Sequence, residues 1–376
     1  MSPHRQTTDL GTAKRIVIKI GSALLVDDEH GTIHRAWLAA LAADVARLHA
    51  RGQQVVIVSS GAIAVGRRHL KFAEGTLRLE EKQAAAATGM VRLAHAYQEE
   101  LAHHDLTLAQ VLLTLDDSEN RRRYLNARNT LETLLRLGAV PLINENDTVA
   151  TDEIRFGDND RLGARVAAMV SADTLILLSD IDGFYTADPR HDDSATIIPE
   201  VHEITAEIEA MAGQSQSNVG SGGMVTKLVA AKIAMAAGCR MVIADGRNLN
   251  PVQRIEEGAP CTWFMPKATP RTARKHWIAG TLNPTGTLVV DDGALNALKS
   301  GKSLLPAGVV AVKGNFEKGD AVIVTAGADT EVARGLVGYS LKDARLLMGH
   351  KSSEIEALLG YRGADELIHR DDLVLS

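Results

Sequence analysis

The sequence has little of what marks several common classes of protein. Aromatic residues make up only 3% of its 376 residues, too few for the stacking platforms that bind single-stranded nucleic acids or for an aromatic strip that binds sugars. Its two cysteines, Cys239 and Cys261, form no CxxC pair and no metal-ligand spacing. We therefore expect packed thiols in a reducing compartment rather than disulfides or a metal site.

Signals for membranes and nucleic acids are also missing. The N-terminal MSPHRQTTDLGTAKR has no apolar signal core, and no run reaches the roughly 20 apolar residues that span a bilayer. A formal net charge of −6 lacks the basic surplus of a broad nucleic-acid-binding face. We expect a cytoplasmic protein of two domains, with a core large enough to fold without disulfides or bound metal ions.

Short apolar runs alternate with helical patterns over the first two thirds of the chain. Amphipathic spacing predicts a helix over Arg35–Ala50, with Gly52 as its stop. Strands separated by helices indicate an α/β fold, a three-layer αβα sandwich whose mainly parallel sheet binds ligands beyond the carboxyl ends of its strands. The predicted strands are Arg15–Ile20, Gln54–Ser59, Leu108–Leu113, Ala139–Ile143, Leu175–Leu178 and Arg240–Ile243.

The composition changes after Met265. The segment PKATPRTARKHWIAGTLNPTG, which begins at Pro266, carries three prolines and a basic cluster, and indicates a linker with a short helix. Beyond it, short strands separated by glycine-rich turns and one helix at Ala294–Lys299 predict a small, mostly β domain. The expected boundaries are 1–265, 266–283 and 284–376, with strands at Thr287–Val290, Val309–Val312 and Ala321–Val324.

The most informative stretch is INENDTVATDEIRFGDNDRLGA, from Ile143 to Ala164. It holds six carboxylates and three side-chain amides with little apolar periodicity. Such residues favour turns through their own side-chain hydrogen bonds, so an ordinary surface loop is one interpretation. A pocket that holds an ammonium group and organises lysines around phosphates is the other.

Two further motifs follow predicted strands. Lys19 with Gly21 ends the first strand, where a lysine can reach phosphate oxygens, although the motif is weak by itself and a partly exposed edge lysine beside a strand-ending glycine is the simpler interpretation. Ser59-Ser60-Gly61-Ala62 follows the second strand and offers amides for an anion, or simply a serine cap and a turn glycine.

A glycine-rich loop and an acidic turn complete the set. The loop GSGGMVTK, residues 220–227, runs into an alanine-rich helix with Lys227 in its first turn, but lacks the spacing of a Walker A loop. The turn after Leu178 carries Asp180 and Asp182, which suit a nucleotide or Mg²⁺ as well as an Asx turn. Taken singly, each motif leaves a structural interpretation open.

Taken together and in this order, the motifs resemble the amino acid kinase family, in its glutamate kinase branch. The matching segments are VIKIGSALL, VSSGAIAVG, LNARNTL, INENDTVATDEIRFGDND, LLSDIDGFYTADPR and GSGGMVTKL. INENDxVA with FGDND is specific to that branch, whereas the lysine motifs are shared more widely. The linker segment ATPRTARKHWIAG also matches, and the C-terminal GxLxVDxGA…LLPAGVVAVKGNF…GLVGYS resembles a PUA domain.

The resemblance implies the amino acid kinase fold and ATP-dependent phosphorylation of the side-chain carboxylate of L-glutamate. The product would be L-glutamyl 5-phosphate, the first intermediate of proline biosynthesis, with Mg²⁺ carried on ATP and few direct metal ligands from the protein, none of which we assign. A carboxylate is already ionised at pH 7, so this chemistry needs no general base. It needs alignment and neutralisation of the charge on the phosphoryl group.

The resemblance also implies roles for individual residues. Lys19 and Lys227 would flank the transferred phosphoryl group, and Asp160 would hold their ammonium groups. Glutamate would be bound by Ser60, Asp147 and Asn159. The ATP contacts would be Lys19, Ser179, Asp180, Ser221, Gly222, Gly223, Met224, Val225, Thr226 and Lys227.

Partners and alternatives follow from the same resemblance. It implies feedback inhibition by proline, a homodimer or homotetramer, and coupling to the next reductase of the pathway. One alternative is a kinase of N-acetylglutamate or aspartate on the same fold. Another is RNA binding through the PUA domain, but from Pro284 onward ten Lys/Arg face thirteen Asp/Glu, so phosphate-driven affinity should be weak.

Overall fold

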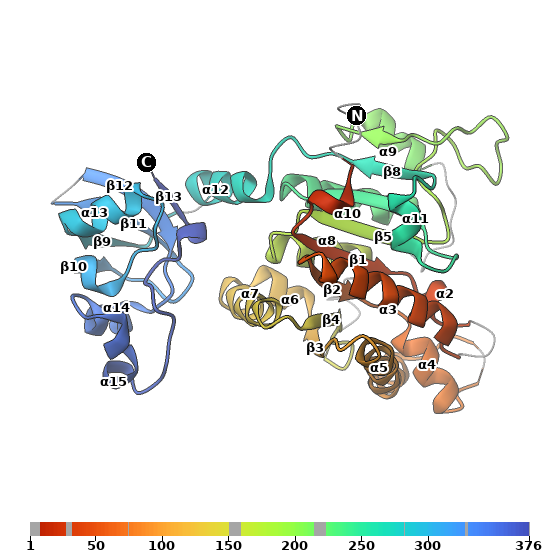
Figure 1. Cartoon of the computed structure of the whole chain (residues 1–376), viewed down its shortest axis with the longest axis horizontal. Helices are drawn as coiled ribbons and strands as arrows, with labels where there is room; N and C mark the ends of the chain where they lie inside the picture. The colour runs from red at the N-terminus through yellow and green to blue at the C-terminus, as the bar shows by residue number, and fades with distance from the viewer. Residues whose placement is uncertain are drawn as a thin grey trace. The chain divides into compact units, whose positions relative to one another are not determined.

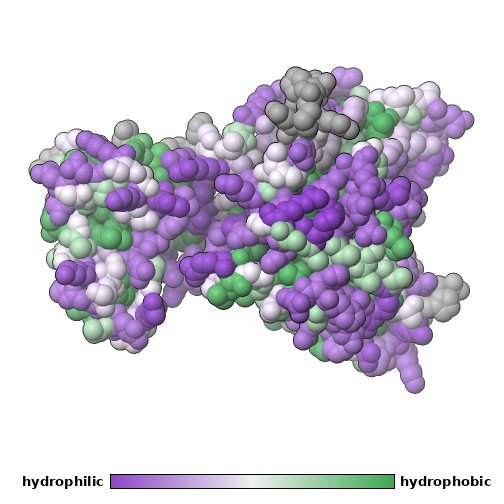
Figure 2. Space-filling view, viewed as in Figure 1, coloured by the Kyte–Doolittle hydropathy of each residue, from purple (hydrophilic) through white to green (hydrophobic). Residues whose placement is uncertain are grey.

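The computed structural model describes residues 8–27, 32–73, 75–149, 159–213, 223–281, 283–327 and 330–375. The chain divides into two compact units, Met1–Pro270 and Arg271–Ser376 (Figure 1). The face in Figure 2 is largely hydrophilic, with apolar side chains in small separate patches. Within the described ranges, no helix is both long and apolar enough to cross a membrane.

The first unit is built on an eight-stranded sheet of order β3-β4-β2-β1-β5-β7-β8-β6. Neighbours from β3 to β7 are parallel, β8 is antiparallel to β7, and β6 is parallel to β8. The predicted mainly parallel sheet is thus confirmed, while the short β6 and β8 were not predicted. The strands are β1 (Arg15–Ile20), β2 (Gln54–Val58), β3 (Leu108–Leu113), β4 (Val140–Glu145), β5 (Thr174–Ser179), β6 (Glu200–Val201), β7 (Arg240–Asp245) and β8 (Cys261–Phe264).

Helices cover both faces of this sheet. One apolar core lies under α3 (Arg35–Ala50), α4 (Ala62–His69), α5 (Leu79–Ala102) and α11 (Pro251–Glu256). The other lies under α7 (Arg121–Arg136), α8 (Asn159–Met169), α9 (Ala206–Gly213) and α10 (Met224–Ala236). The shorter α2 (Ser22–Leu25) and α6 (Leu115–Glu119) follow β1 and β3. The result is the three-layer αβα arrangement expected from the sequence.

The alternation of strand β1 decides where its lysine points. Ile16, Ile18 and Ile20 belong to the core under α3 and α5, whereas Val17 belongs to the core under α8 and α10. Successive side chains of a strand point to opposite faces, so Lys19 shares the face of Val17. The lysine at the end of β1 is therefore directed toward the helical layer that contains α8.

Helices α4 and α5 cross at two glycines. A Cβ added to Gly66 would lie 1.7 Å from the carbonyl oxygen of Ala85, and one added to Gly89 would lie 1.8 Å from that of Ala62. No side chain fits at such distances, so the two helices touch through their backbones. This contact fixes α5 against the segment that follows β2.

The second unit is a small, mostly β domain. Its five-stranded sheet has the order β10-β9-β11-β12-β13, with β9 and β11 parallel and the other pairs antiparallel. The predicted strands lie within β9, β10 and β11, whereas β12 and β13 were not predicted. The elements are β9 (Gly286–Val290), α13 (Asp292–Lys299), β10 (Val309–Gly314), β11 (Ala321–Ala326), β12 (Thr330–Leu336), α14 (Leu341–Leu347), α15 (Ile355–Leu359) and β13 (Leu373–Leu375).

Most of the segment expected as a linker is helix α12 (Pro270–Thr281). Its Arg274 pairs with Asp372 near the C-terminus, and both side chains are largely shielded from solvent. Ile278 of the same helix is also buried. The helix is thus anchored within the second unit.

Candidate active site

The predicted site residues follow the carboxyl ends of parallel strands. Because β1, β2, β4, β5 and β7 run in the same direction, the segments that follow them lie at one edge of the sheet. Those segments carry Lys19, Ser59-Ser60, Asn144 to Asp147, Ser179-Asp180 and Asp245. The first turns of α8 and α10 add Asp160 and Lys227.

Three charged side chains meet in the interior at this edge. The Nζ of Lys19 forms an ion pair with Oδ1 of Asp160, and the Nζ of Lys227 lies 3.3 Å from its Oδ2. Lys19 is 7% exposed, Lys227 is 5% exposed and Asp160 is fully buried. We call these residues the Lys–Asp–Lys triad. One carboxylate thus orients two ammonium groups that come from different elements.

Counted by itself, the triad carries more positive than negative charge. Two ammonium groups and one carboxylate leave a net charge of +2 − 1 = +1 in a nearly buried position. Burial opposes ionisation of Asp160, but the two lysines outweigh it and hold the pKa of its carboxyl below the ordinary value. Two ammonium groups held by one carboxylate are suited to contact the oxygens of an anion.

Glycines allow the helices to approach the triad. A Cβ added to Gly163 in α8 would lie 3.2 Å from Cβ of Lys19 and 3.4 Å from its Cγ, tighter than ordinary contact. At the start of α10, Thr226 Oγ1 donates to the carbonyl oxygen of Gly223 at 2.6 Å and lies 3.4 Å from Oδ2 of Asp160. The two helices therefore bring their first turns together at Asp160.

Next to Asp160, the amide of Asn159 links α8 to the segment after β2. Its Nδ2 donates to the carbonyl oxygen of Ser59 at 3.0 Å and to Oγ of Ser60 at 2.6 Å. A carbonyl accepts only, so it is the NH₂ group of Asn159 that must face Ser59. Both amide hydrogens are then used, and Oδ1 of Asn159 meets no donor in the described ranges.

The same segment ends at the N-terminus of α4. Gly61 precedes this helix with φ of +93°, in the left-handed region that favours glycine. A Cβ there would also lie 2.8 Å from Cγ2 of Val26. Within the described ranges, no acceptor takes the N–H of Gly61. Amides at the start of a helix attract anions, so this turn is suited to a carboxylate.

The other predicted residues lie at the same edge. Asp147 is half-buried in the turn after β4. At the end of β5, Ser179 Oγ donates a hydrogen bond of 3.0 Å to Oδ1 of Asp180. At the start of α10, Gly223, Met224 and Thr226 are half-buried and Val225 is exposed. Two predicted nucleotide contacts, Ser221 and Gly222, lie outside the described residues, as do Asp152, Glu153 and Asp158 of the acidic stretch.

The sequence interpretation missed Tyr97. Its side chain is buried in α5, and its hydroxyl lies 3.2 Å from Oγ of Ser59. The helical spacing of buried positions in α5 places it on the buried side of the helix, together with Ala85, Ala86, Gly89, Met90, Leu93 and Ala96. That spacing is visible in the sequence, but it does not show that the tyrosine reaches the segment after β2.

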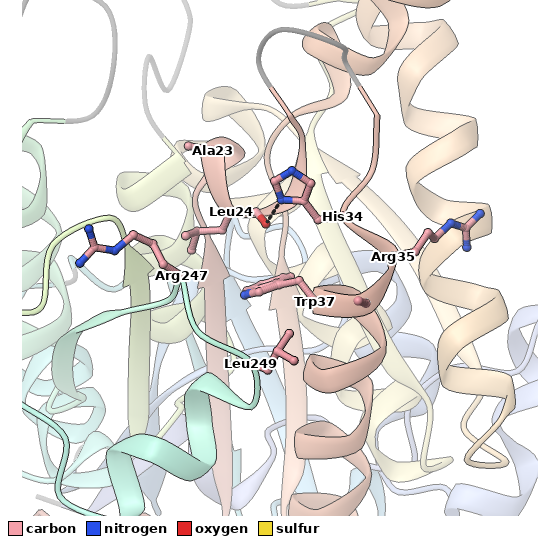
Figure 3. A pocket seen from close by; sticks show the side chains of 8 residues that line it. Ala23, Leu24, His34, Arg35, Trp37, Arg247 and Leu249 are labelled. Atoms are coloured by element: carbon pink, nitrogen blue, oxygen red, sulfur yellow. Dashed lines mark hydrogen bonds between the residues drawn. The ribbon is translucent and has the colours of Figure 1, made fainter.

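A separate depression of about 480 Å³ opens on the opposite face of the sheet (Figure 3). Trp37 and Leu24, which line it, belong to the core under α3 and α5, whereas Lys19 faces α8. The Trp37 indole donates to the carbonyl oxygen of Gly246 at 2.6 Å. Its lining consists of Ala23, Leu24, His34, Arg35, Ala36, Trp37, Arg247 and Leu249. This depression is therefore distinct from the Lys–Asp–Lys triad.

Comparison with family models matches both units. Residues 14–245 match the model of the amino acid kinase family, and residues 286–359 match that of the PUA domain. The carbamate kinase from Giardia lamblia bound to AMP-PNP has a similar fold, with a TM-score of 0.50 and 17% identity over 69% of this chain and all of that one. The first match spans the whole triad, from Lys19 to Lys227.

Curated relatives extend the similarity to nearly the full chain. The glutamate 5-kinase of Paramagnetospirillum magneticum is 67% identical, covering 97% of this chain and 99% of its own. That of Rhodospirillum rubrum is 62% identical over 96% of both. A chain that shares this much sequence with these relatives, and the family model over more than half its length, belongs to the amino acid kinase family and within it to the glutamate 5-kinases.

Proposed function

We propose that this protein transfers the γ-phosphoryl group of ATP to the side-chain carboxylate of L-glutamate, giving L-glutamyl 5-phosphate and ADP. The names of its relatives support this substrate pair. The proposal places the enzyme at the first step of proline biosynthesis. As parts of the same proposal, we expect inhibition by proline, a homodimer or homotetramer, and delivery of the labile product to a reductase.

The observation that carries the proposal is the pairing of two buried lysines with one carboxylate in the Lys–Asp–Lys triad. A transferring phosphoryl group spreads negative charge over its equatorial oxygens. Two ammonium groups that are held in place by one carboxylate supply the counter-charge without reorganising during the reaction. Asp160 acts here as an orienting group, because both of its oxygens already contact lysines.

In this proposal the nucleophile is an oxygen of the glutamate side-chain carboxylate. That oxygen forms a bond to the γ-phosphorus while the bond from phosphorus to the β,γ-bridging oxygen breaks, and ADP leaves with the electron pair. The carboxylate is ionised at neutral pH, so no proton has to be removed. Lys19 and Lys227 would contact the oxygens of the transferred group.

We assign the nucleotide to the carboxyl end of β5 and the start of α10. Ser179, Asp180 and residues 223–227 lie there, next to Lys227, and Ser221 and Gly222 belong to the same proposal. Mg²⁺ would be carried on ATP and would neutralise charge on its phosphate oxygens. Asp180 is exposed at this edge and is available to a hydrated Mg²⁺.

The amino acid is assigned to the segment after β2. Ser60 accepts a hydrogen bond from Asn159, so its own hydroxyl hydrogen can be donated to a substrate carboxylate. The N–H of Gly61 can donate to the same group. Oδ1 of Asn159 and the carboxylate of Asp147 are acceptors that suit the substrate ammonium. This division matches the two charged groups of an amino acid.

Trapping of the product with hydroxylamine tests the proposal. Acyl phosphates react with hydroxylamine to give a hydroxamate, which is measured as its coloured iron complex. The enzyme should form hydroxamate with ATP, Mg²⁺ and L-glutamate, and far less with N-acetylglutamate or L-aspartate at equal concentration. Preferential turnover of N-acetylglutamate or aspartate, or hydroxamate without ATP, would reject the proposed substrate.

A further inference from the structure

We propose that Tyr97 is a positioning residue of the glutamate site, which acts through Ser59 on the peptide group between Ser60 and Gly61. Neither the family match nor the motifs of the sequence point to this tyrosine. The inference rests on the proposed function, because it assigns the segment after β2 to the amino acid substrate.

The hydroxyl of Tyr97 has a single polar partner in the described residues. Its ring lies in the apolar core under α3 and α5, and its oxygen is 3.2 Å from Oγ of Ser59. Burial raises the pKa of the Tyr97 phenol, so the group keeps its proton over the physiological range. A buried hydroxyl with one partner is held in one orientation, because breaking that contact would leave it unsatisfied.

The direction of the hydrogen bond between Tyr97 and Ser59 is indicated by the second hydrogen bond of Ser59. Ser59 Oγ donates its only hydrogen to the carbonyl oxygen of Ser60 at 3.3 Å. The opposite direction would leave the buried hydroxyl hydrogen of Tyr97 without an acceptor among the described residues, so we take Tyr97 as the donor to Ser59. The result is a chain of donation from Tyr97 to the Ser59 hydroxyl, and from there to the Ser60 carbonyl.

This chain orients an amide of the substrate site. The carbonyl of Ser60 and the N–H of Gly61 belong to one planar trans peptide group, so they point in opposite directions. Fixing the carbonyl toward Ser59 directs the N–H away from it, on the side where we assign a substrate carboxylate. Asn159 holds the preceding carbonyl, that of Ser59, at 3.0 Å. Two consecutive peptide groups are thus fixed by side chains from α5 and α8.

The packing of α5 against α4 holds Tyr97 in place. The backbone contact between Gly66 and Gly89 holds α5 against α4, and α4 begins directly after Gly61. Tyr97 lies two turns beyond Gly89 on the same helix. Helix α5 therefore contacts the segment after β2 through the tyrosine at Ser59, and contacts α4, the helix that follows this segment, through its backbone.

The test is Tyr97→Phe, which removes only the hydroxyl. We expect the KM for glutamate to rise about fivefold, as for loss of one neutral hydrogen bond, with kcat and the KM for ATP within about twofold of the parent. Tyr339→Phe is the matched control, because Tyr339 is also buried and donates to the carbonyl oxygen of Ala364 in the second unit. That control should leave all three constants unchanged.

Ser59→Ala breaks the same chain without altering the aromatic core. It should reproduce the rise in the glutamate KM, and the double variant should show no further rise, since both changes remove one pathway. An unchanged glutamate KM in both folded single variants would overturn the inference, as would equal rises for glutamate and ATP or multiplicative effects in the double variant. If the parent forms no glutamate-dependent hydroxamate, the proposed function fails instead.

Discussion

The ammonium group of Lys227 lies 3.3 Å from Oδ2 of Asp160 although 67 residues of chain separate them. They meet because α8 and α10 start at the same edge of the sheet and pack side by side. Lys19 reaches the other carboxylate oxygen from the end of β1. A helix start is a favourable place for the carboxylate, whose charge complements the helix dipole.

Replacing Lys227 should abolish most of the activity without unfolding the protein. Lys227→Met keeps the length and apolar stem of the side chain but removes its charge, so we expect kcat to fall at least about 100-fold. Lys232→Met is the matched control, because Lys232 lies on the same helix but is exposed and pairs with Glu209. Equal activity of the two variants in the hydroxamate assay would remove Lys227 from the proposed mechanism.

Asp160 should stabilise the fold in a pH-dependent way. Asp160→Asn leaves two buried ammonium groups without their carboxylate, which we expect to cost about 3 kcal/mol of unfolding free energy at neutral pH. The pKa of Asp160 is lower in the folded chain than its ordinary value of 3.8. The contribution of its charge is therefore fully present above pH 3.8 and is lost as the pH falls through the folded-state pKa.

Urea unfolding of parent and Asp160→Asn protein at several pH values measures this effect. The difference in free energy should be constant from about pH 5 to 7 and should shrink toward zero in more acidic solution. A difference that grows on acidification would contradict the assignment of Asp160 as the charged partner of both lysines.

Much of this site could be predicted from the sequence because its residues directly follow strands. A lysine that ends β1 and an aspartate that begins α8 are positioned by backbone direction alone, before any long-range packing is known. The alternation of β1 also places Lys19 on the face of Val17. What the sequence could not provide was the link from Tyr97 to Ser59, since it depends on how α5 crosses α4.

Asp147 should discriminate between a free and an acylated amine. Asp147→Asn removes the proposed counter-charge of the substrate ammonium, so the KM for glutamate should rise at least about tenfold. The KM for ATP should stay within about twofold, and residual activity with N-acetylglutamate should not fall. Asp116→Asn serves as the control, because Asp116 is an exposed residue of α6 that pairs with Arg123 at 2.9 Å. Parallel rises in both KM values would remove Asp147 from the glutamate site.

The short strands β6 and β8 and the glycine crossing escaped prediction for a related reason. Cys261–Phe264 is a four-residue strand whose pairing is set by β7 rather than by its own pattern. Gly89 lies inside a helical pattern, where glycine is unfavourable by propensity and gives no sign of the backbone it contacts. Both features depend on partners that are distant in sequence.

The crossing of α4 and α5 leads to a prediction in which two effects of opposite sign compete. Alanine favours a helix over glycine by about 1 kcal/mol, so Gly89→Ala would stabilise an isolated helix. In the folded chain, however, its Cβ would lie 1.8 Å from the carbonyl oxygen of Ala62, which requires the helices to separate. We expect steric overlap to win and the free energy of unfolding to fall by about 3 kcal/mol or more.

Gly213→Ala separates the two effects. Gly213 ends α9, and a Cβ there would meet nothing within 4 Å, so this variant should unfold at the same temperature as the parent or slightly higher. Thermal denaturation of both variants gives the comparison.

The crossing also holds Tyr97 near Ser59. Any folded Gly89→Ala protein should therefore lose more affinity for glutamate than for ATP, compared with the parent. Normal stability and a normal glutamate KM in Gly89→Ala would show that α5 does not fix the conformation of the segment after β2.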